Sequence, residues 1–408
     1  MSHIDQERRL IDMAQNLQQP CSPGAVQMRG VNQREVLEMA LEQLEQWVNI
    51  PRPQRASYSI GDILSVLIYA AAHRTTIEQA CSALGGAPHS NTVRGAAAGL
   101  QVEALEKELN QILASSLPES LFRRPLEIAI DLTLIPYYGE AREGEEDFLL
   151  HGKAKQGTTT FFGYASIYVI KKNKRFTLAI TVVRNSNGLV GILDRLLSCF
   201  SLLGGEILCL YLDRQFYSVR VLGLLIYERD IPFCMAAPKK GKKGGINGLI
   251  SRKGVGVHPY TVRSPKDGQV TVQVAVVGKY LKGRWGKHGR QIHAFVTHRY
   301  PFCLGGLFEK YRHRFGIESS YRIWDGARAR TASQRVSLRL ILVGIALLLQ
   351  NLWVFLLWEA VSIPSQGGRK VLGKLFTFQR LLFFLINAIE HLYPPVEEVV
   401  IHIQASPL

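Results

Sequence analysis

The sequence has few cysteines, and none of them form the arrangements typical of metal sites or disulfide frameworks. Its 6 cysteines lie far apart and form no Cys-x-x-Cys pair, so we expect no structural zinc site. Cys209 lies in the apolar run Ile207–Leu212, which is typical of a buried thiol in a reducing compartment. The first residues also lack the apolar core of a signal peptide. Together these absences predict a cytoplasmic protein.

Acidic residues are scarce relative to basic ones. The 408 residues include 49 Lys and Arg against 33 Asp and Glu, a formal net charge of +16. This excess predicts a polyanionic partner, either a nucleic acid or an anionic membrane surface. Hydrophobic residues make up 47% of the chain, which excludes wholesale disorder and allows a sizeable core. The length predicts two or three domains.

One stretch lacks charge altogether. The nineteen residues Leu340–Trp358 contain no charged side chain, and a run of about 17–25 apolar residues can span a bilayer. Gln350 and Asn351 lie near its centre, and the chain contains no second run of this kind. We expect a buried helix of the catalytic core and no stable membrane association. A membrane-associated basic protein remains an alternative.

Residues 1–122 are predicted to form a helical, DNA-binding region. Within it, residues 76–98 show the pattern of a helix-turn-helix, in which Ser90 would cap the second helix. Asn91 and Arg94 would then face the major groove. Any pair of packed helices gives a similar pattern, so a hairpin without a DNA contact remains open. The region contains predicted helices at 32–49, capped by Asn32, and at 60–72, 76–84 and 90–98.

From residue 123 to 408 the pattern predicts a catalytic domain with a mixed sheet flanked by helices, an α/β fold. Residues 239–300 are predicted to be a β-ribbon inserted into this domain, with strands at 270–277 and 292–296. The other predicted strands are 126–135, 161–170, 176–183, 207–212 and 231–235, and the predicted helices between them are 191–200 and 216–229.

Two aspartates occupy unusual places in these strands. Asp131 lies in the first strand, and Asp213 directly follows the strand 207–212, where an open α/β sheet usually places its ligand. Burying a carboxylate among apolar strands is costly unless it is paired or binds a metal ion. A helix-capping role, or for Asp213 an ion pair with a neighbour such as Arg214, would also explain these positions.

A helix over residues 311–325 would place five polar side chains within roughly 80° of one face. These are Tyr311, Arg314, Glu318, Arg322 and Asp325. One interpretation is a solvent-exposed face with ion pairs four residues apart. The other is a face that contacts a phosphate backbone and presents one metal-binding carboxylate. The spacing alone does not separate them.

Three elements together resemble the DDE transposases of bacterial insertion sequences: Asp131-Leu-Thr with Tyr137-Tyr-Gly, Leu212-Asp213-Arg-Gln-Phe-Tyr217, and Tyr311-x2-Arg314-x3-Glu318. The likeness covers about residues 125–360. It is to the branch in which a β-strand insertion precedes a Tyr-Arg-Glu-Lys signature helix. One position departs from that signature, because Asp325 stands where the family has its lysine. The charge would have to come from Arg322, Arg328 or Arg330.

The resemblance implies a ribonuclease-H-like fold in which Asp131, Asp213 and Glu318 hold two Mg²⁺ ions, with Mn²⁺ as a substitute. Carboxylate oxygens are ligands that hard divalent cations prefer. Such enzymes cut DNA at the ends of a transposable element and join the new 3′-hydroxyl to target DNA. They usually act as dimers on paired ends. By the same matching, the side chains that contact DNA near the cleaved end would be Tyr311, Arg314 and Arg322.

The predicted ribbon carries a tryptophan among basic residues. Some relatives stack a flipped base on an aromatic residue of the insertion, and Trp285 has surroundings suited to that role. Packing of Trp285 on a neighbouring strand is the alternative. The predicted phosphate track includes Lys239, Lys240, Arg284 and Lys287, with further lysines and arginines between 241 and 290. A solvated loop would have the same composition.

The sequence therefore predicts a nucleoid-associated DDE transposase that depends on Mg²⁺. The main alternative is a non-catalytic DNA-binding protein, such as a decayed transposase retained for binding.

Overall fold

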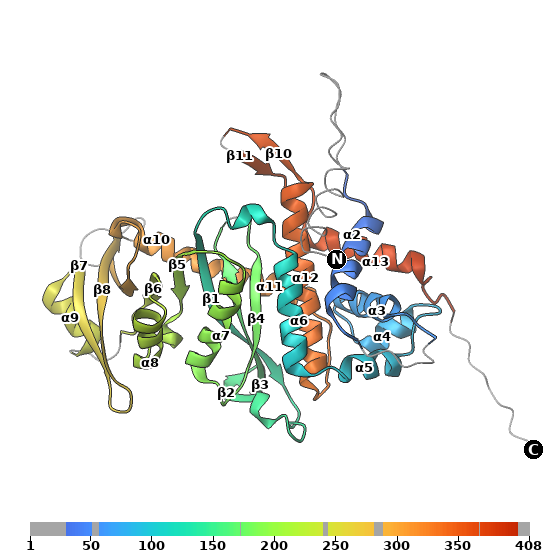
Figure 1. Ribbon diagram of the computed structural model, residues 1–408, viewed down its shortest axis with the longest axis horizontal. Coiled ribbons are helices and arrows are strands. Elements are labelled where there is room, and N and C mark those ends of the chain that lie inside the picture. The colour runs from blue at the N-terminus through green and yellow to red at the C-terminus, as the bar shows by residue number, and fades with distance from the viewer. Residues whose placement is uncertain are drawn as a thin grey trace, which may run out of the picture. The chain divides into compact units, whose positions relative to one another are not determined.

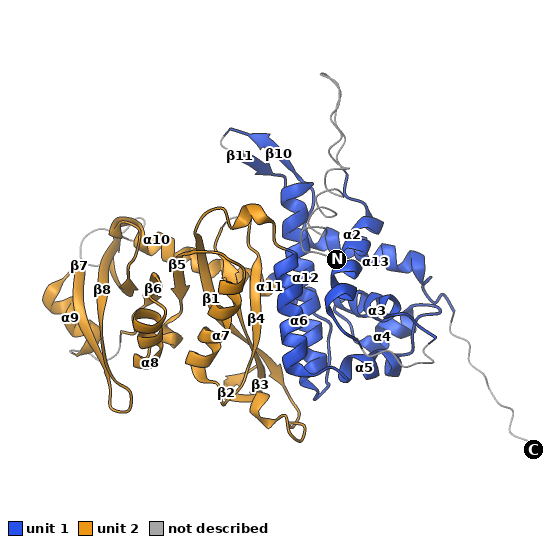
Figure 2. Cartoon of the chain, in the orientation of Figure 1, with its two compact units in different colours: residues 1–116, 323–408 blue, residues 117–322 orange. Residues whose placement is uncertain are grey.

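The computed structural model describes residues 30–50, 57–171, 173–239, 244–280, 289–366 and 368–398 (Figure 1). The chain forms two compact units (Figure 2). Unit 1 combines residues 1–116 with 323–408, and unit 2 comprises residues 117–322. The expected division placed everything after residue 122 in one domain, whereas here the last part of the chain packs in unit 1 with the N-terminal helices.

Unit 2 is built on a nine-stranded mixed sheet with the order β2-β3-β1-β5-β6-β9-β8-β7, in which β4 also pairs with β3. β1 is antiparallel to β3 and parallel to β5, and β5 is parallel to β6. The strands are β1 (Leu126–Tyr137), β2 (Leu149–Lys155), β3 (Thr158–Val169), β4 (Thr177–Val183), β5 (Ile207–Leu212), β6 (Phe233–Ala236), β7 (Gly256–Ser264), β8 (Gly268–Tyr280) and β9 (Arg290–His298).

Helices cover this sheet, as the apolar strands require. Every residue of β4 is buried, which is typical of a strand covered on both faces. The helix α7 (Gly188–Leu202) packs on β3 and β4. One helix was expected over 216–229, but the structure has a short α8 (Val219–Gly223) followed by a π-helical turn at Leu224–Glu228.

The predicted inserted β-ribbon continues the main sheet. After the helix α9 (Gly245–Lys253), β7, β8 and β9 form an antiparallel meander. β9 then pairs antiparallel with β6, with Phe233 opposite His298. The chain continues through α10 (Leu307–Arg312), a 3-10 turn (His313–Phe315) and α11 (Gly316–Asp325), so the expected helix at 311–325 contains a break.

Unit 1 is helical. The predicted cap of its first described helix is confirmed, because the Asn32 side chain accepts a hydrogen bond from the backbone N–H of Glu35. Its elements are α2 (Gln33–Trp47), α3 (Ile60–Ala72), α4 (Ile77–Ala83), α5 (Ser90–Ala98), α6 (Val102–Ser115), α12 (Val336–Glu359), α13 (Phe378–Leu392) and a hairpin of β10 (Ser362–Ser365) and β11 (Gly368–Val371).

The long uncharged run forms α12, which is long and apolar enough to cross a membrane by length and composition. In unit 1 it packs against α3, α5 and α6, and 89% of its most apolar window is buried. Asn351 donates a hydrogen bond to Ser116 (3.1 Å) from a fully buried position. A helix that is apolar on all sides needs several helices to cover it. α3, α5 and α6 do so here, and α12 therefore belongs to the core of unit 1.

Candidate active site beside β1 and β5

Neighbouring parallel strands bring the two aspartates together. In the pairing of β1 with β5, Ile130 lies opposite Leu212, so Asp131 and Asp213 follow at adjoining positions. This is the edge of an open α/β sheet at which ligands usually bind. Asp213 does not cap the 3-10 turn that follows, because its side chain makes no capping hydrogen bond.

Two tyrosines fix the helical segment 307–322 to these strand ends. The Tyr311 hydroxyl donates to the backbone oxygen of Leu212 (2.9 Å), the residue before Asp213. The Tyr321 hydroxyl donates to the backbone oxygen of Asp131 (2.8 Å) and lies 3.1 Å from Ser166 Oγ. The Tyr311 ring also packs against Phe295, with ring centroids 4.8 Å apart.

Arg314 lies at the meeting point of three carboxylates. Its Nη1 is 3.3 Å from Asp131 Oδ2, and its Nη2 is 3.8 Å from both Asp213 Oδ1 and Glu318 Oε1. The Arg314 side chain is 4% exposed, whereas Asp213 is 35% and Glu318 52% exposed. Arg314 Nε is buried without a hydrogen-bond partner in the described part of the chain. The predicted triad therefore converges on one cation.

Burial dominates the electrostatics of Asp131. It raises the pKa of this carboxyl to about 6, and the negative charges of Asp213 and Glu318 act in the same direction. The Arg314 charge and the backbone N–H of Leu132 (2.9 Å from Oδ1) oppose the rise. Burial alone lowers the pKa of Arg314, but Tyr311 and the three carboxylates raise it overall. Arg314 therefore keeps its charge, and three carboxylates face one guanidinium.

The donor chemistry of this cluster fits a hard divalent cation. All three acids offer carboxylate oxygens, two of them are open to solvent, and their combined charge exceeds that of Arg314. Among the described residues, no three Asp, Glu, His or Cys side chains form a group ready to hold a metal ion. The carboxylates meet at the Arg314 guanidinium instead.

Tyr311 and Arg314 have almost no exposed atoms with which to make the DNA contacts expected of them. Tyr311 is 6% and Arg314 3% exposed, because both side chains turn inward to the strand ends and the carboxylates. Arg322 is exposed, and its Nε lies 3.4 Å from the backbone oxygen of Glu318. Asp325, in place of the signature lysine, pairs within unit 1 with Arg328 (2.9 Å) and Arg74 (3.4 Å).

The predicted phosphate track is described only in part. Trp285, Arg284, Lys287 and Lys240 lie outside the described residues. Lys239 donates from Nζ to the backbone oxygen of Ile292. Lys279, another described lysine of this region, forms an ion pair with Glu309.

The predicted helix-turn-helix in unit 1 forms two packed helices, α4 and α5. Its expected cap was wrong: His89 caps α5 by accepting from the N–H of Asn91, while Ser90 donates to Glu78 (2.6 Å). Arg94 forms an ion pair with the same Glu78 (2.6 Å). Asn91 is exposed, whereas the Arg94 guanidinium is held by a carboxylate.

The sequence did not predict a role at the acidic cluster for two side chains, those of Gln215 and Tyr321. Gln215 donates from Nε2 to Asp131 Oδ1 (3.2 Å), and Tyr321 supports the backbone of Asp131. Tyr321 stands three residues after Glu318 and seven after Arg314, so helical spacing already placed it on their face. Gln215 had no periodicity to mark it, because it lies in a turn.

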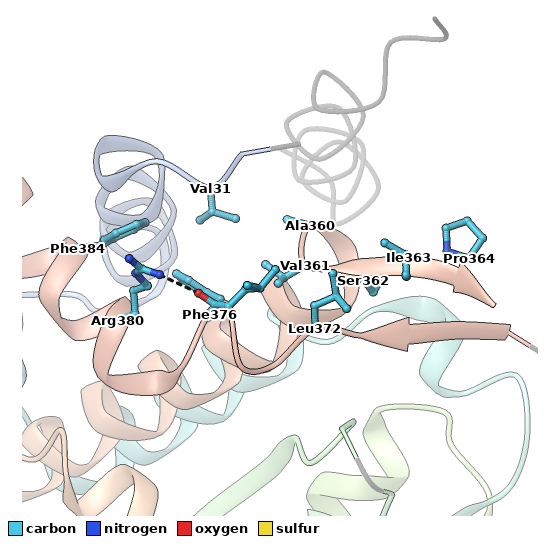
Figure 3. A pocket seen from close by; sticks show the side chains of 11 residues that line it. Val31, Ala360, Val361, Ser362, Ile363, Pro364, Leu372, Phe376, Arg380 and Phe384 are labelled. Carbon is cyan, nitrogen blue, oxygen red and sulfur yellow. Dashed lines mark hydrogen bonds between the residues drawn. The ribbon is translucent and has the colours of Figure 1, made fainter. Parts of the chain in front are cut away.

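Unit 1 also contains a largely apolar cavity of about 530 Å³ between α13 and the base of the β10–β11 hairpin (Figure 3). Ala360, Leu372, Phe376 and Phe384 contribute to its wall. Its one charged lining residue, Arg380, donates to the backbone oxygen of Leu375 (3.1 Å). The lining offers no carboxylate, and its one hydroxyl, that of Ser362, donates to the backbone oxygen of Trp358 (2.6 Å).

The sheet order of unit 2, with Asp131 in the middle of β1 and Asp213 directly after β5, is that of a ribonuclease-H-like α/β fold, as predicted. The chain shares its fold with a piggyBac transposase, solved by cryo-electron microscopy as a synaptic complex with hairpin DNA. The match has a TM-score of 0.52 and 11% sequence identity, and covers 88% of this chain and 80% of that one. No protein-family model and no curated protein matches the sequence.

Proposed function

We propose that this protein is a transposase whose unit 2 cleaves DNA and transfers its strands with the acids of the cluster. The observation that carries the proposal is the convergence of Asp131, Asp213 and Glu318 on Arg314, where the parallel pairing of β1 with β5 ends. The shared fold with a piggyBac transposase supports the same class of protein. That protein was solved with DNA, and DNA also fits the net charge of +16 here.

Within the site, Asp131, Asp213 and Glu318 would hold divalent cations, with Mg²⁺ as the expected ion and Mn²⁺ as a substitute. When bound, such ions activate an attacking oxygen and stabilise the leaving oxygen of a phosphodiester. Gln215 would orient the Asp131 carboxylate through its hydrogen bond to Oδ1. Tyr311 and Tyr321 would fix the position of Glu318 relative to both aspartates, since they bond the helical segment to the strand ends.

The finer assignment follows from the resemblance of the sequence motifs. By that resemblance the protein would belong with the bacterial insertion-sequence transposases of the Tyr-Arg-Glu-Lys branch and would act as a homodimer on paired element ends. Arg322, which is exposed one turn after Glu318, would contact DNA from the signature helix. Lys239, Arg284 and Trp285 of the insertion would extend that contact.

The test is DNA cleavage by the full-length protein in Mg²⁺, with the sequences that flank its own gene as substrate. Wild type is compared with Asp131→Asn, Asp213→Asn and Glu318→Gln. Asp194→Asn is the matched control, because Asp194 is an exposed acid of unit 2 that pairs with Arg229. We expect breaks at defined flanking positions with wild type and with the control, and none with the three variants.

The same experiment addresses the main alternative, a non-catalytic DNA-binding protein. That alternative predicts tight DNA binding without breaks, and no difference among wild type and the variants. Breaks that persist in all three variants would reject the proposed acids and point to chemistry elsewhere in the chain.

A further inference from the structure

A second cavity in unit 1 is rich in arginine. It has a volume of about 480 Å³ and lies among the start of α4, the helix α5, the linker before α12 and the first turns of α12. Arg94, Arg330 and Arg335 line it together with Glu78. The three arginines come from two segments more than two hundred residues apart in sequence. The fold of unit 1 therefore gathers cations that the sequence separates.

The linker that supplies two of these arginines is fixed in place. The backbone N–H of Arg330 donates to the backbone oxygen of Thr75 (2.8 Å). The Arg335 guanidinium donates from Nη1 to the backbone oxygen of Ala98 (3.3 Å), so this side chain is held near the end of α5. A linker whose backbone is already fixed loses less conformational entropy when the cavity binds an anion.

The charges of this cavity are only partly neutralised. Arg94 pairs with Glu78, which also accepts a hydrogen bond from Ser90. Within the described residues, neither Arg330 nor Arg335 forms an ion pair with an acid, although the nearby Arg74 and Arg328 both pair with Asp325. The lining therefore carries three positive charges against one negative charge. That excess is available to an anionic ligand.

The other polar groups of the lining suit phosphate oxygens. The Thr331 hydroxyl oxygen accepts from the N–H of Ser333 (3.0 Å), and the Ser333 hydroxyl oxygen accepts from the N–H of Arg335 (3.1 Å). Each hydroxyl keeps its hydrogen to donate. Guanidinium groups match the geometry of phosphate oxygens and form strong charge-assisted bonds with them. Arg335 also stands at the N-cap position of α12, so the positive end of the helix dipole adds to the field.

We propose that this cavity binds phosphate groups of a DNA backbone. The linker before α12 would then dock on DNA beside the α4–α5 hairpin through Arg330 and Arg335, and Arg94 would shape the cavity through Glu78 instead of reading a base. Contacts of this kind set the register of a protein on DNA without selecting a sequence. The inference rests on the proposed function, which supplies DNA as the partner, and adds a binding site in unit 1.

The test is the salt dependence of the affinity of the full-length protein for a duplex of arbitrary sequence. Wild type is compared with Arg330→Ala/Arg335→Ala. The matched control is Arg34→Ala/Arg369→Ala, which also removes two arginine charges from unit 1, both from ion pairs with Glu38 and Glu359. Thermal unfolding midpoints check that both double variants fold as wild type does.

Each neutralised phosphate steepens the slope of log affinity against log salt concentration by about 0.9. We therefore expect the slope for Arg330→Ala/Arg335→Ala to be shallower than that of wild type by about 1–2. The loss of affinity should be similar for unrelated sequences. A slope equal to that of the control would overturn the inference and leave cleavage by unit 2 intact. Wild-type protein that binds no DNA would overturn both proposals.

Inorganic phosphate separates a backbone site from a site for a small anion. Phosphate that raises the unfolding midpoint of wild type but not of Arg330→Ala/Arg335→Ala, together with an unchanged DNA slope, would mean that the cavity binds free anions. That result would also overturn the inference. Asp194→Asn should keep the wild-type slope, because Asp194 pairs with Arg229 in unit 2 and is not part of this cavity.

Discussion

Arg314 and Asp131 form a buried ion pair, with Nη1 3.3 Å from Oδ2 and side chains only 4% and 13% exposed. Removing one partner of a buried pair leaves the other charge unsolvated, which typically costs about 3–5 kcal/mol. Here the loss also leaves Asp213 and Glu318 without their shared cation. We expect Arg314→Ala to lower the free energy of unfolding by about that amount, measured by urea denaturation. Arg322→Ala, the exposed control, should change it by less than about 0.5 kcal/mol.

The raised pKa of Asp131 makes stability depend on pH. Burial moves this pKa from 3.8 to about 6. Between these two pH values the Asp131 carboxyl is therefore protonated in the native state but ionised in the unfolded chain. Stability that is present below pH 3.8 is therefore lost as the pH rises through about 6. Asp131→Asn removes this dependence. We expect the free energy of unfolding of the variant, relative to wild type, to rise by about 2–3 kcal/mol between pH 4 and 7.5. A difference that stays constant over this range would contradict the assignment.

The same titration controls metal binding, because a carboxyl group must lose its proton to become a ligand. We expect Mg²⁺ or Mn²⁺ to bind wild type more tightly at pH 7.5 than at pH 5, as measured by isothermal titration calorimetry. Glu318→Gln should weaken binding at both values, whereas Asp194→Asn should not. Equal affinity in wild type and Glu318→Gln would remove Glu318 from the set of ligands.

The Tyr321 hydroxyl is expected to position Asp131 without touching the substrate. Tyr321→Phe removes its bond to the Asp131 backbone, which should cost about 1 kcal/mol of stability. Misplacement of a reacting group by about 1 Å can reduce the rate about 100-fold, so we expect cleavage to slow by about 10- to 100-fold at unchanged DNA affinity. Tyr69→Phe in unit 1 removes a comparable bond, to Glu390 (2.9 Å), and is the control. A cleavage rate that falls equally in both variants would indicate a general loss of stability.

Close packing between α12 and α6 depends on Gly344. A Cβ there would lie 2.3 Å from Leu109 Cδ2, so Gly344→Ala should destabilise the protein by about 1–3 kcal/mol. Gly95→Ala on α5 meets open space and should be neutral or stabilising by up to about 1 kcal/mol. Adding Leu109→Ala to Gly344→Ala should cost less than the two single changes together. Additive costs would mean that the two residues are not in contact.

Local patterns in the sequence identified much of the sheet. The strand at 207–212 was predicted with its observed bounds, and the cap at Asn32 was confirmed. Both predictions depend only on residues that are close together in the sequence. The pairing of β9 with β6 could not be read in this way, since it joins Phe233 to His298 across most of the insertion. The packing of α12 in unit 1 is equally nonlocal.

The candidate site shows what periodicity can and cannot predict. Helical spacing placed Tyr311, Arg314 and Glu318 on one face, and the structure brings that face to Asp131 and Asp213. The spacing did not reveal what covers the face, so Tyr311 and Arg314 were interpreted as surface residues although they are buried. Their polar atoms are satisfied by strand ends and carboxylates, not by solvent or DNA. The catalytic role of the three acids remains a prediction.

The discontinuity of unit 1 has a consequence for synthesis of the chain. Unit 2 is continuous in sequence, whereas the core of unit 1 needs α12 and α13, which leave the ribosome after all of unit 2. Domains fold as units while the chain emerges. Residues 30–116 must therefore wait with their apolar faces uncovered until the C-terminal helices arrive, and unit 2 completes its fold first. A chain whose synthesis ends before residue 336 would contain every described strand of the unit 2 sheet but would lack α12 and α13 of unit 1.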